Sequence, residues 1–146
     1  MIVVDTTVLL YAVGTHHPLR QPSVRLIEAI REGSLHATTT VEVIQEFVHA
    51  FARRRDRRDA SRVGRAWAAL LAPLISTMRE DLEQGLTLYE SDPRLGAFDA
   101  LLAAAALARG AEALVSADRA FAAVSGLRHV DPATPALDDL LSPHAS

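Results

Sequence analysis

The first twelve residues, MIVVDTTVLLYA (1–12), set an acid between two apolar runs. The run Ile2–Val4 is typical of a short buried strand, and Asp5 follows it directly. Burying an unpaired carboxylate costs free energy, so an acid at this place indicates a site that uses negative charge. The alternative is a turn residue that only ends the strand. The rest of the chain helps to decide between the two.

Short apolar segments alternate with longer helical patterns after this start. Pro22 suits the first turn of a helix, and Thr40 and Asp59 suit N-caps. The alternation predicts an α/β fold in which helices cover both faces of a mostly parallel sheet of four to five strands. We predict strands at 2–5, 35–39, 74–77, 113–117 and 127–131, and helices at 22–31, 41–54, 60–72, 79–90 and 98–109. Residues 6–14 are expected to form a helix or a turn.

The length of 146 residues predicts one domain over residues 1–132, followed by a tail over 133–146. Leu137, Leu140 and Leu141 form a small apolar group in this tail, which we expect to dock on the domain or on a partner. The chain has no apolar stretch of the roughly 18 residues that a membrane span needs, and no signal-peptide pattern. It also has no cysteine. These features together favour a cytoplasmic protein.

The charged residues exclude several kinds of chemistry. All 15 basic residues are arginine, so the chain has neither the lysine of a P-loop nor a lysine for Schiff-base catalysis. The net charge of −3 gives no overall attraction to nucleic acid. Any binding of nucleic acid must therefore depend on a local basic segment.

Four acids stand where a parallel sheet would gather them. Asp5 and Asp118 each follow a predicted strand, close to the edge where parallel sheets bind ligands. Asp99 opens an alanine-rich helix, and Glu46 lies in the helix after the second strand, on the same face as Glu42. Carboxylates that are brought together repel one another, and a hard cation such as Mg²⁺ removes that conflict. Each acid alone could be a structural cap, but the four together favour a metal site, and periodicity does not choose between the two glutamates.

Four segments carry a family resemblance, and they extend from residue 1 to about residue 132: MIVVDTTVLLYA, TTTVEVIQEFVHAFARR, LGAFDALLAAAALARGAEALVSAD and RHVDP. Together they resemble the PIN domain and, more narrowly, the VapC-type ribonuclease toxins of type II toxin–antitoxin pairs. The resemblance implies a PIN-like three-layer α/β/α sandwich. It also implies a Mg²⁺-dependent endoribonuclease, with Mn²⁺ as a substitute, that is inhibited by a cognate VapB-type antitoxin. Such proteins often form homodimers, which we expect to use an apolar face of the early helices.

The resemblance also implies a set of catalytic acids. Asp5 matches the first acid, which ends strand one before a hydroxyl residue. Glu46 matches the second, because it comes six residues after Thr40 at the helix start. Asp99 and Asp118 match the third and fourth. We expect Asp5 and Asp99 to be direct metal ligands, and Glu46 and Asp118 to act through water. The residues that we expect to orient these acids are Thr6, Ser116 and Glu42.

An RNA substrate also needs positive charge near the acidic site. The segment ARRRDRRDASRVGR (52–65) supplies it, although a solvated helix end is an equally simple explanation. Trp67 lies among apolar residues, so we expect it in the core rather than against a base. The candidates for RNA contacts are Arg53, Arg54, Arg55, Arg57 and Arg58.

Two other functions are open to this sequence. Asp5 could form an aspartyl-phosphate, but that chemistry usually places a second acid where Thr7 stands and usually uses a lysine. A non-catalytic PIN-like module could bind RNA or protein with an inert site. The presence of all four acids argues against such a module.

Overall fold

A four-stranded parallel sheet forms the centre of the computed structural model, which describes residues 1–142. The strand order is β2-β1-β3-β4, so β1 lies inside the sheet with a parallel neighbour on each side. All three residues of β1 are buried, as its unbroken apolar sequence predicts. The strands are β1 (Ile2–Val4), β2 (Ala37–Thr38), β3 (Leu114–Val115) and β4 (His129–Val130).

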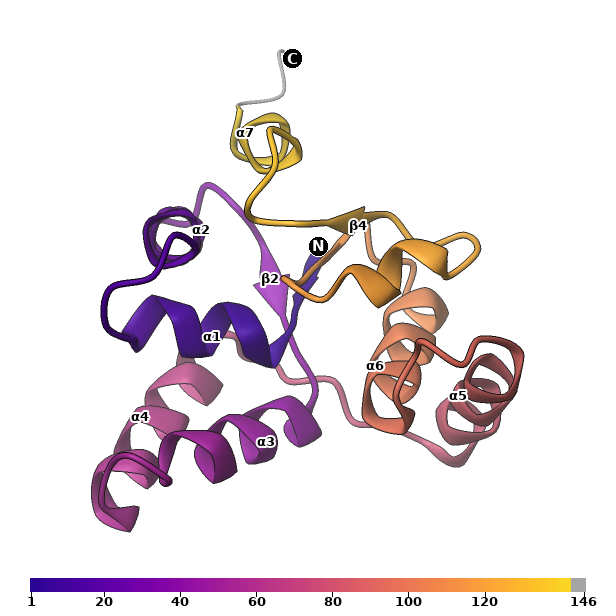
Figure 1. The fold of residues 1–146 in the computed structure, drawn as a ribbon, viewed down its shortest axis with the longest axis horizontal. Helices are drawn as coiled ribbons and strands as arrows, with labels where there is room; N and C mark the ends of the chain where they lie inside the picture. The colour runs from indigo at the N-terminus through magenta and orange to yellow at the C-terminus, as the bar shows by residue number, and fades with distance from the viewer. Residues whose placement is uncertain (143–146) are drawn as a thin grey trace.

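Helices cover the sheet on both sides (Figure 1), which confirms the predicted α/β fold. The helices α1, α2 and α4 lie on one side of the strands, and α5 and α6 lie on the other. The helices within residues 1–142 are α1 (Thr6–Val13), α2 (Arg20–Arg31), α3 (Val41–Phe51), α4 (Arg57–Leu70), α5 (Arg79–Ser91), α6 (Ala97–Ala108) and α7 (Ala136–Leu141), with a 3₁₀-helix, η1 (Arg119–Ala123). None of them is long and apolar enough to cross a membrane.

Small residues allow two helix pairs to pack closely. In α6 the alanines at 100 and 103–106 are buried, which brings this helix against the sheet. A Cβ atom on Gly85 of α5 would lie 3.0 Å from the Cα of Leu101, so α5 and α6 are in backbone contact. A Cβ on Gly64 of α4 would likewise lie 2.5 Å from a methyl group of Val48 in α3. Trp67 of α4 is buried in the core, as predicted, with its ring edge-on to that of Phe47.

A buried ion pair also holds α5 against α6. Arg109, at the end of α6, donates from Nη1 to Oδ1 of Asp81 at 2.5 Å and from Nη2 to the carbonyl oxygen of Ser76 at 2.8 Å. Asp81 is 4% exposed, and its other oxygen accepts a hydrogen bond from the N–H of Met78 at the start of α5. The hydrogen bond from Arg109 holds the pKa of Asp81 below its usual value. The helix α6, whose first turn contains Asp99, is therefore held firmly against α5.

Three local predictions were wrong. Residues 74–77 do not form a strand, because only Ile75 pairs, in a single bridge to Thr40, between Pro73 and the start of α5. The sheet therefore has four strands. The N-cap of α4 is Asp56 rather than Asp59, since the Asp56 side chain accepts from the N–H of Asp59, and this helix spans 57–70 instead of 60–72.

Other helix boundaries follow the sequence closely. The helix α2 begins two residues before Pro22, which is tolerated there because the first N–H groups of a helix have no intrahelical partner. The Thr40 side chain accepts a hydrogen bond from the N–H of Val43 at 3.2 Å, so the predicted N-cap of α3 is confirmed.

The chain after residue 132 returns to the body of the domain. Leu137 and Leu140 of α7 are buried, and α7 packs against α2. An exposed ion pair joins Arg25 of α2 to Asp138 at 2.8 Å. The apolar group predicted in the tail thus docks on the domain, while the domain boundary near residue 132 stays a prediction. Residues 143–146 of the tail lie outside the described part of the chain.

Candidate active site

Asp5 lies at the carboxyl end of β1 and is only 3% exposed. Its N–H donates to the carbonyl oxygen of Val115, so β1 and β3 remain paired up to this residue. Its side chain does not cap α1. Instead, Oδ2 accepts hydrogen bonds from Ser116 Oγ at 2.6 Å and from Thr7 Oγ1 at 3.0 Å. Two neutral hydroxyl groups therefore hold this buried carboxylate in place.

The same two hydroxyl groups tie the ends of β1 and β3 together. Ser116 Oγ accepts from the N–H of Asp118 at 2.9 Å, and Thr7 Oγ1 accepts from the N–H of Ala117 at 3.1 Å. Ser116 thus lies where it orients Asp5, as expected for that residue. Thr7 was not among the predicted orienting residues. Its signal in the sequence is a hydroxyl two residues after an acid, a spacing at which side chains of this kind bond locally.

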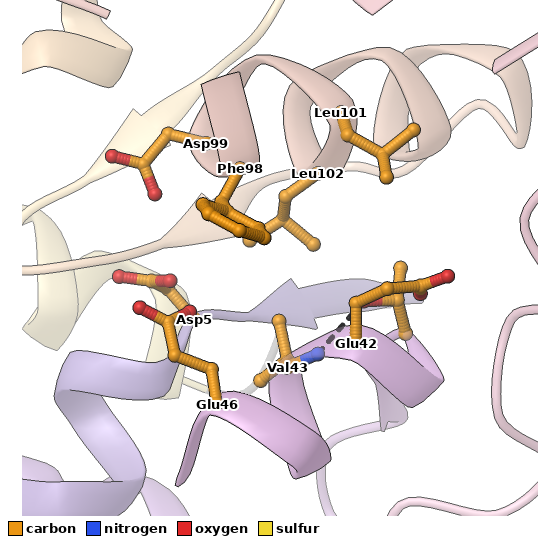
Figure 2. A pocket seen from close by; sticks show the side chains of 9 residues that line it. Asp5, Glu42, Val43, Glu46, Phe98, Asp99, Leu101 and Leu102 are labelled. Carbon is orange, nitrogen blue, oxygen red and sulfur yellow. Dashed lines mark hydrogen bonds between the residues drawn. The ribbon is translucent and has the colours of Figure 1, made fainter. Parts of the chain in front are cut away.

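The two glutamates of α3 have different surroundings. Thr6 Oγ1 donates to Glu46 Oε2 at 2.8 Å, so Thr6 orients this glutamate rather than Asp5. Thr77 Oγ1 donates to Glu42 Oε1. Figure 2 shows the carboxylate of Glu46 beside that of Asp5, while Glu42 points to the opposite end of the pocket. Periodicity could not separate these residues because the difference comes from Thr6 and Thr77, which lie outside α3.

Asp99 stands in the first turn of α6, across the pocket from Asp5 and Glu46 (Figure 2). Partial burial raises the pKa of Asp99, and the nearby carboxylates of Asp5, Asp118 and Glu46 raise it further, to about 7. Three different elements therefore bring negative charge close enough to disturb one carboxyl group. This crowding is the conflict that a cation would remove.

Asp118 fills a structural role as well as lying near the other acids. Its Oδ1 accepts from the N–H of Ala120 at 2.9 Å and so caps η1. Asp118 is thus a structural cap, which was the alternative to a role at a metal site. Its effect on the pKa of Asp99 places it in the same group of carboxylates. The four predicted acids are therefore brought together.

The donor set suits a hard cation that keeps most of its water. The pocket between α3 and α6 is lined by Asp5, Glu42, Glu46 and Asp99, and no sulfur or imidazole group lies among them. Within residues 1–142, no three His, Asp or Glu side chains already stand close enough to hold a metal ion together. Mg²⁺ typically takes one or two carboxylates and retains several waters. A pair such as Asp5 and Asp99 therefore fits Mg²⁺ better than Zn²⁺, whose protein sites usually include cysteine or histidine ligands.

The five predicted RNA-contacting arginines lie in the turn between α3 and α4 and in the first turn of α4, and all are exposed. Arg53 contacts His49, and the guanidinium of Arg55 lies 5.7 Å from the centre of the Phe51 ring. Arg57 lines a groove that also contains Glu46 and Phe98. Arg57 is therefore the member of this set that lines a space leading to the acidic pocket. The remaining members are Arg54 in the turn and Arg58 in the first turn of α4, and both are exposed.

Comparison with known proteins gives related results for sequence and for fold. The family model of the PIN domain matches residues 2–127. The chain is 51% identical to Ribonuclease VapC7 of Mycobacterium tuberculosis, over 97% of this chain and 98% of that protein. It is 33% identical to Ribonuclease VapC23 of the same species, over 84% of this chain and 96% of that protein. The crystal structure of FitAcB from Neisseria gonorrhoeae shares the fold, with a TM-score of 0.70 at 13% identity, over 90% of this chain and 98% of that chain.

Proposed function

Because this chain belongs to the PIN domain family and, within it, to the VapC ribonucleases, we propose that it is a metal-dependent endoribonuclease and the toxin of a toxin–antitoxin pair. One observation carries the proposal. Asp5, Glu46, Asp99 and Asp118 come from four separate parts of the chain and lie near one another. Partial burial of Asp99, together with the other three carboxylates, raises its pKa to about 7. Carboxylates that repel one another in this way weaken folding unless a cation offsets their charge.

In this proposal Asp5 and Asp99 bind Mg²⁺, or Mn²⁺ in its place. The cation would lower the pKa of a bound water and neutralise charge on the phosphodiester under attack. Ser116 and Thr7 fix the direction of the Asp5 carboxylate, and Thr6 fixes that of Glu46. Glu46 and Asp118 act through water molecules rather than by direct ligation.

The partners in this proposal are an RNA substrate, a cognate VapB-type antitoxin and a second copy of the chain. We place the contact between copies on α5, because large exposed apolar side chains follow one face of this helix. The early helices α1 and α2, where we expected an apolar face, expose fewer large apolar side chains than α5 does. We propose the cytoplasm as the location, since that is where a bacterial cell holds its RNA. The exposed apolar residues at the start and along α5 are Met78, Leu82, Leu86 and Tyr89.

The first experiment is incubation of the purified chain, free of antitoxin, with total RNA and Mg²⁺ or Mn²⁺. We expect discrete fragments, whose ends are mapped by sequencing, and no fragments when EDTA is present. Asp99→Asn and Asp5→Asn should also abolish cleavage, because each removes a ligand charge while keeping the shape of the side chain. Asp139→Asn is the matched control, since Asp139 is an exposed acid on α7 and should leave cleavage unchanged.

Three outcomes would contradict this proposal in different ways. Cleavage that persists in EDTA would overturn metal dependence. Normal cleavage by Asp5→Asn or Asp99→Asn would overturn the role of that residue. RNA that stays intact but binds to the chain would favour the non-catalytic module instead.

A further inference from the structure

The acidic pocket continues into a groove beside α3 and α4. Glu42, Glu46 and Phe98 line both spaces, so the two are connected. The groove has a volume of about 660 Å³, within the range of roughly 300–1,000 Å³ that is usual for ligand sites. His49 and Arg57 line the groove but not the pocket. A ligand that extends from the pocket along the groove therefore meets carboxylates first and a guanidinium later.

Phe98 stands where the two spaces join. It is 77% exposed, more than any other large apolar side chain within residues 1–142. It projects from the first turn of α6 toward α3, directly beside Asp99 (Figure 2). None of the contacts between aromatic rings within residues 1–142 involves Phe98. One aromatic face is thus open to solvent next to a proposed metal ligand.

Charge decides which part of an RNA strand suits each end of this space. Near Glu42 and Glu46 a phosphate would be repelled, whereas a neutral base would not. Near Arg57 a phosphate would be attracted. Stacking on aromatic side chains is a general way in which proteins hold the bases of unpaired strands. An aromatic ring at the acidic end and an arginine farther along therefore match the order of base and phosphate in one strand.

We propose that Phe98 stacks against the RNA base next to the scissile bond, and that Arg57 contacts the following phosphate. This assignment rests on the proposed endoribonuclease function and adds a residue that positions the substrate. Stacking at this point fixes the strand beside Asp99, so that the scissile bond lies where the proposed cation would offset the repulsion between its phosphate and the acids. The ring binds the substrate and takes no part in the bond cleavage.

The test compares two replacements of Phe98 on a defined substrate. Phe98→Leu keeps apolar bulk but removes the aromatic face, whereas Phe98→Tyr keeps the ring. The substrate is a short oligoribonucleotide with the cleavage sequence mapped from total RNA, and two further versions lack the base on one side or the other of the scissile bond. We expect Phe98→Leu to raise KM about tenfold with little change in kcat, and Phe98→Tyr to resemble the wild type.

The base-deleted substrates separate stacking from other effects. Deleting the stacked base should raise KM of the wild type by the same factor and should not affect Phe98→Leu further, because both changes remove one interaction. An unchanged KM for Phe98→Leu would overturn the inference, and so would a loss that is equally large on every base-deleted substrate. If the wild-type chain cleaves no RNA, the proposed function itself fails. That outcome is distinct from a loss confined to the Phe98 variants.

Discussion

Replacement of Asp99 by asparagine should stabilise the metal-free protein at neutral and alkaline pH, although it should abolish activity. The reason is the raised pKa of Asp99, about 7 in the folded state against 3.8 for an unperturbed aspartate. In the unfolded chain this carboxyl group loses its proton at the lower pH. The folded protein must therefore hold either an unfavourable charge or a bound proton that the unfolded chain has already released.

The sign of the pH dependence follows from this difference. Below pH 3.8 both states carry the proton, and Asp99 costs no stability. Between pH 3.8 and about 7 the folded state binds more protons than the unfolded state, so stability falls as the pH rises. Above about pH 7 the cost is complete. At roughly 1.4 kcal/mol for each pKa unit, the upper limit is about 4 kcal/mol. Because Asp99 is partly exposed, solvent screening lowers the expected value to about 1–3 kcal/mol.

Urea denaturation in EDTA at pH 5 and pH 8 measures the effect. The Asp99→Asn variant should exceed the wild type in free energy of unfolding, and its advantage should be larger at pH 8 by about 1–2 kcal/mol. Added Mg²⁺ should stabilise the wild type more than the variant, since the variant lacks one proposed ligand. Asp139→Asn controls for the loss of one surface charge. An advantage that is absent, or equal at the two pH values, would refute the crowding of acids on which the proposed site depends.

Two further predictions concern the helix pair that carries Asp99. Arg109→Ala should lower the free energy of unfolding by about 2–4 kcal/mol, because it leaves the buried carboxylate of Asp81 without its partner. Urea denaturation tests this, and a loss below about 0.5 kcal/mol would show that the ion pair is dispensable. Gly85→Ala should lower the melting temperature and reduce RNA cleavage. Its methyl group would lie 3.0 Å from the Cα of Leu101, so α6 would have to shift. Overpacking of this kind costs about 1–3 kcal/mol of stability. An unchanged melting temperature and unchanged cleavage would mean that α5 and α6 can move apart without a loss of stability.

The arrangement of the fold could be predicted because its signals are local. The apolar run before Asp5 marks a buried strand, the alanines around residues 103–106 mark a buried helix, and Thr40 marks a helix start. Residues 74–77 have a similar apolar pattern but pair only once. A short apolar run shows that a segment is buried, and it does not show whether a neighbouring strand is within reach.

The grouping of the acids could be predicted, and so could Ser116 as a partner of Asp5, but the different partners of the two glutamates could not. The positions of Asp5 and Asp118 at strand ends placed them at one edge of the sheet. The choice between Glu42 and Glu46 depends on Thr77 and Thr6, which are 35 and 40 residues away from them in the chain. No periodic pattern records a contact of this kind. The groove containing Phe98 depends in the same way on packing between distant helices.

The two buried aspartates within residues 1–142, Asp5 and Asp81, are stabilised in opposite ways. Asp81 is paired with Arg109, whereas none of the ion pairs within residues 1–142 includes Asp5. Hydroxyl groups lower the cost of burying Asp5 without cancelling its charge. An arginine in the place of Thr7 would cancel that charge and compete with any incoming cation. The kind of partner therefore distinguishes a carboxylate whose charge is cancelled within the fold from one whose charge remains, even where both are equally hidden from solvent.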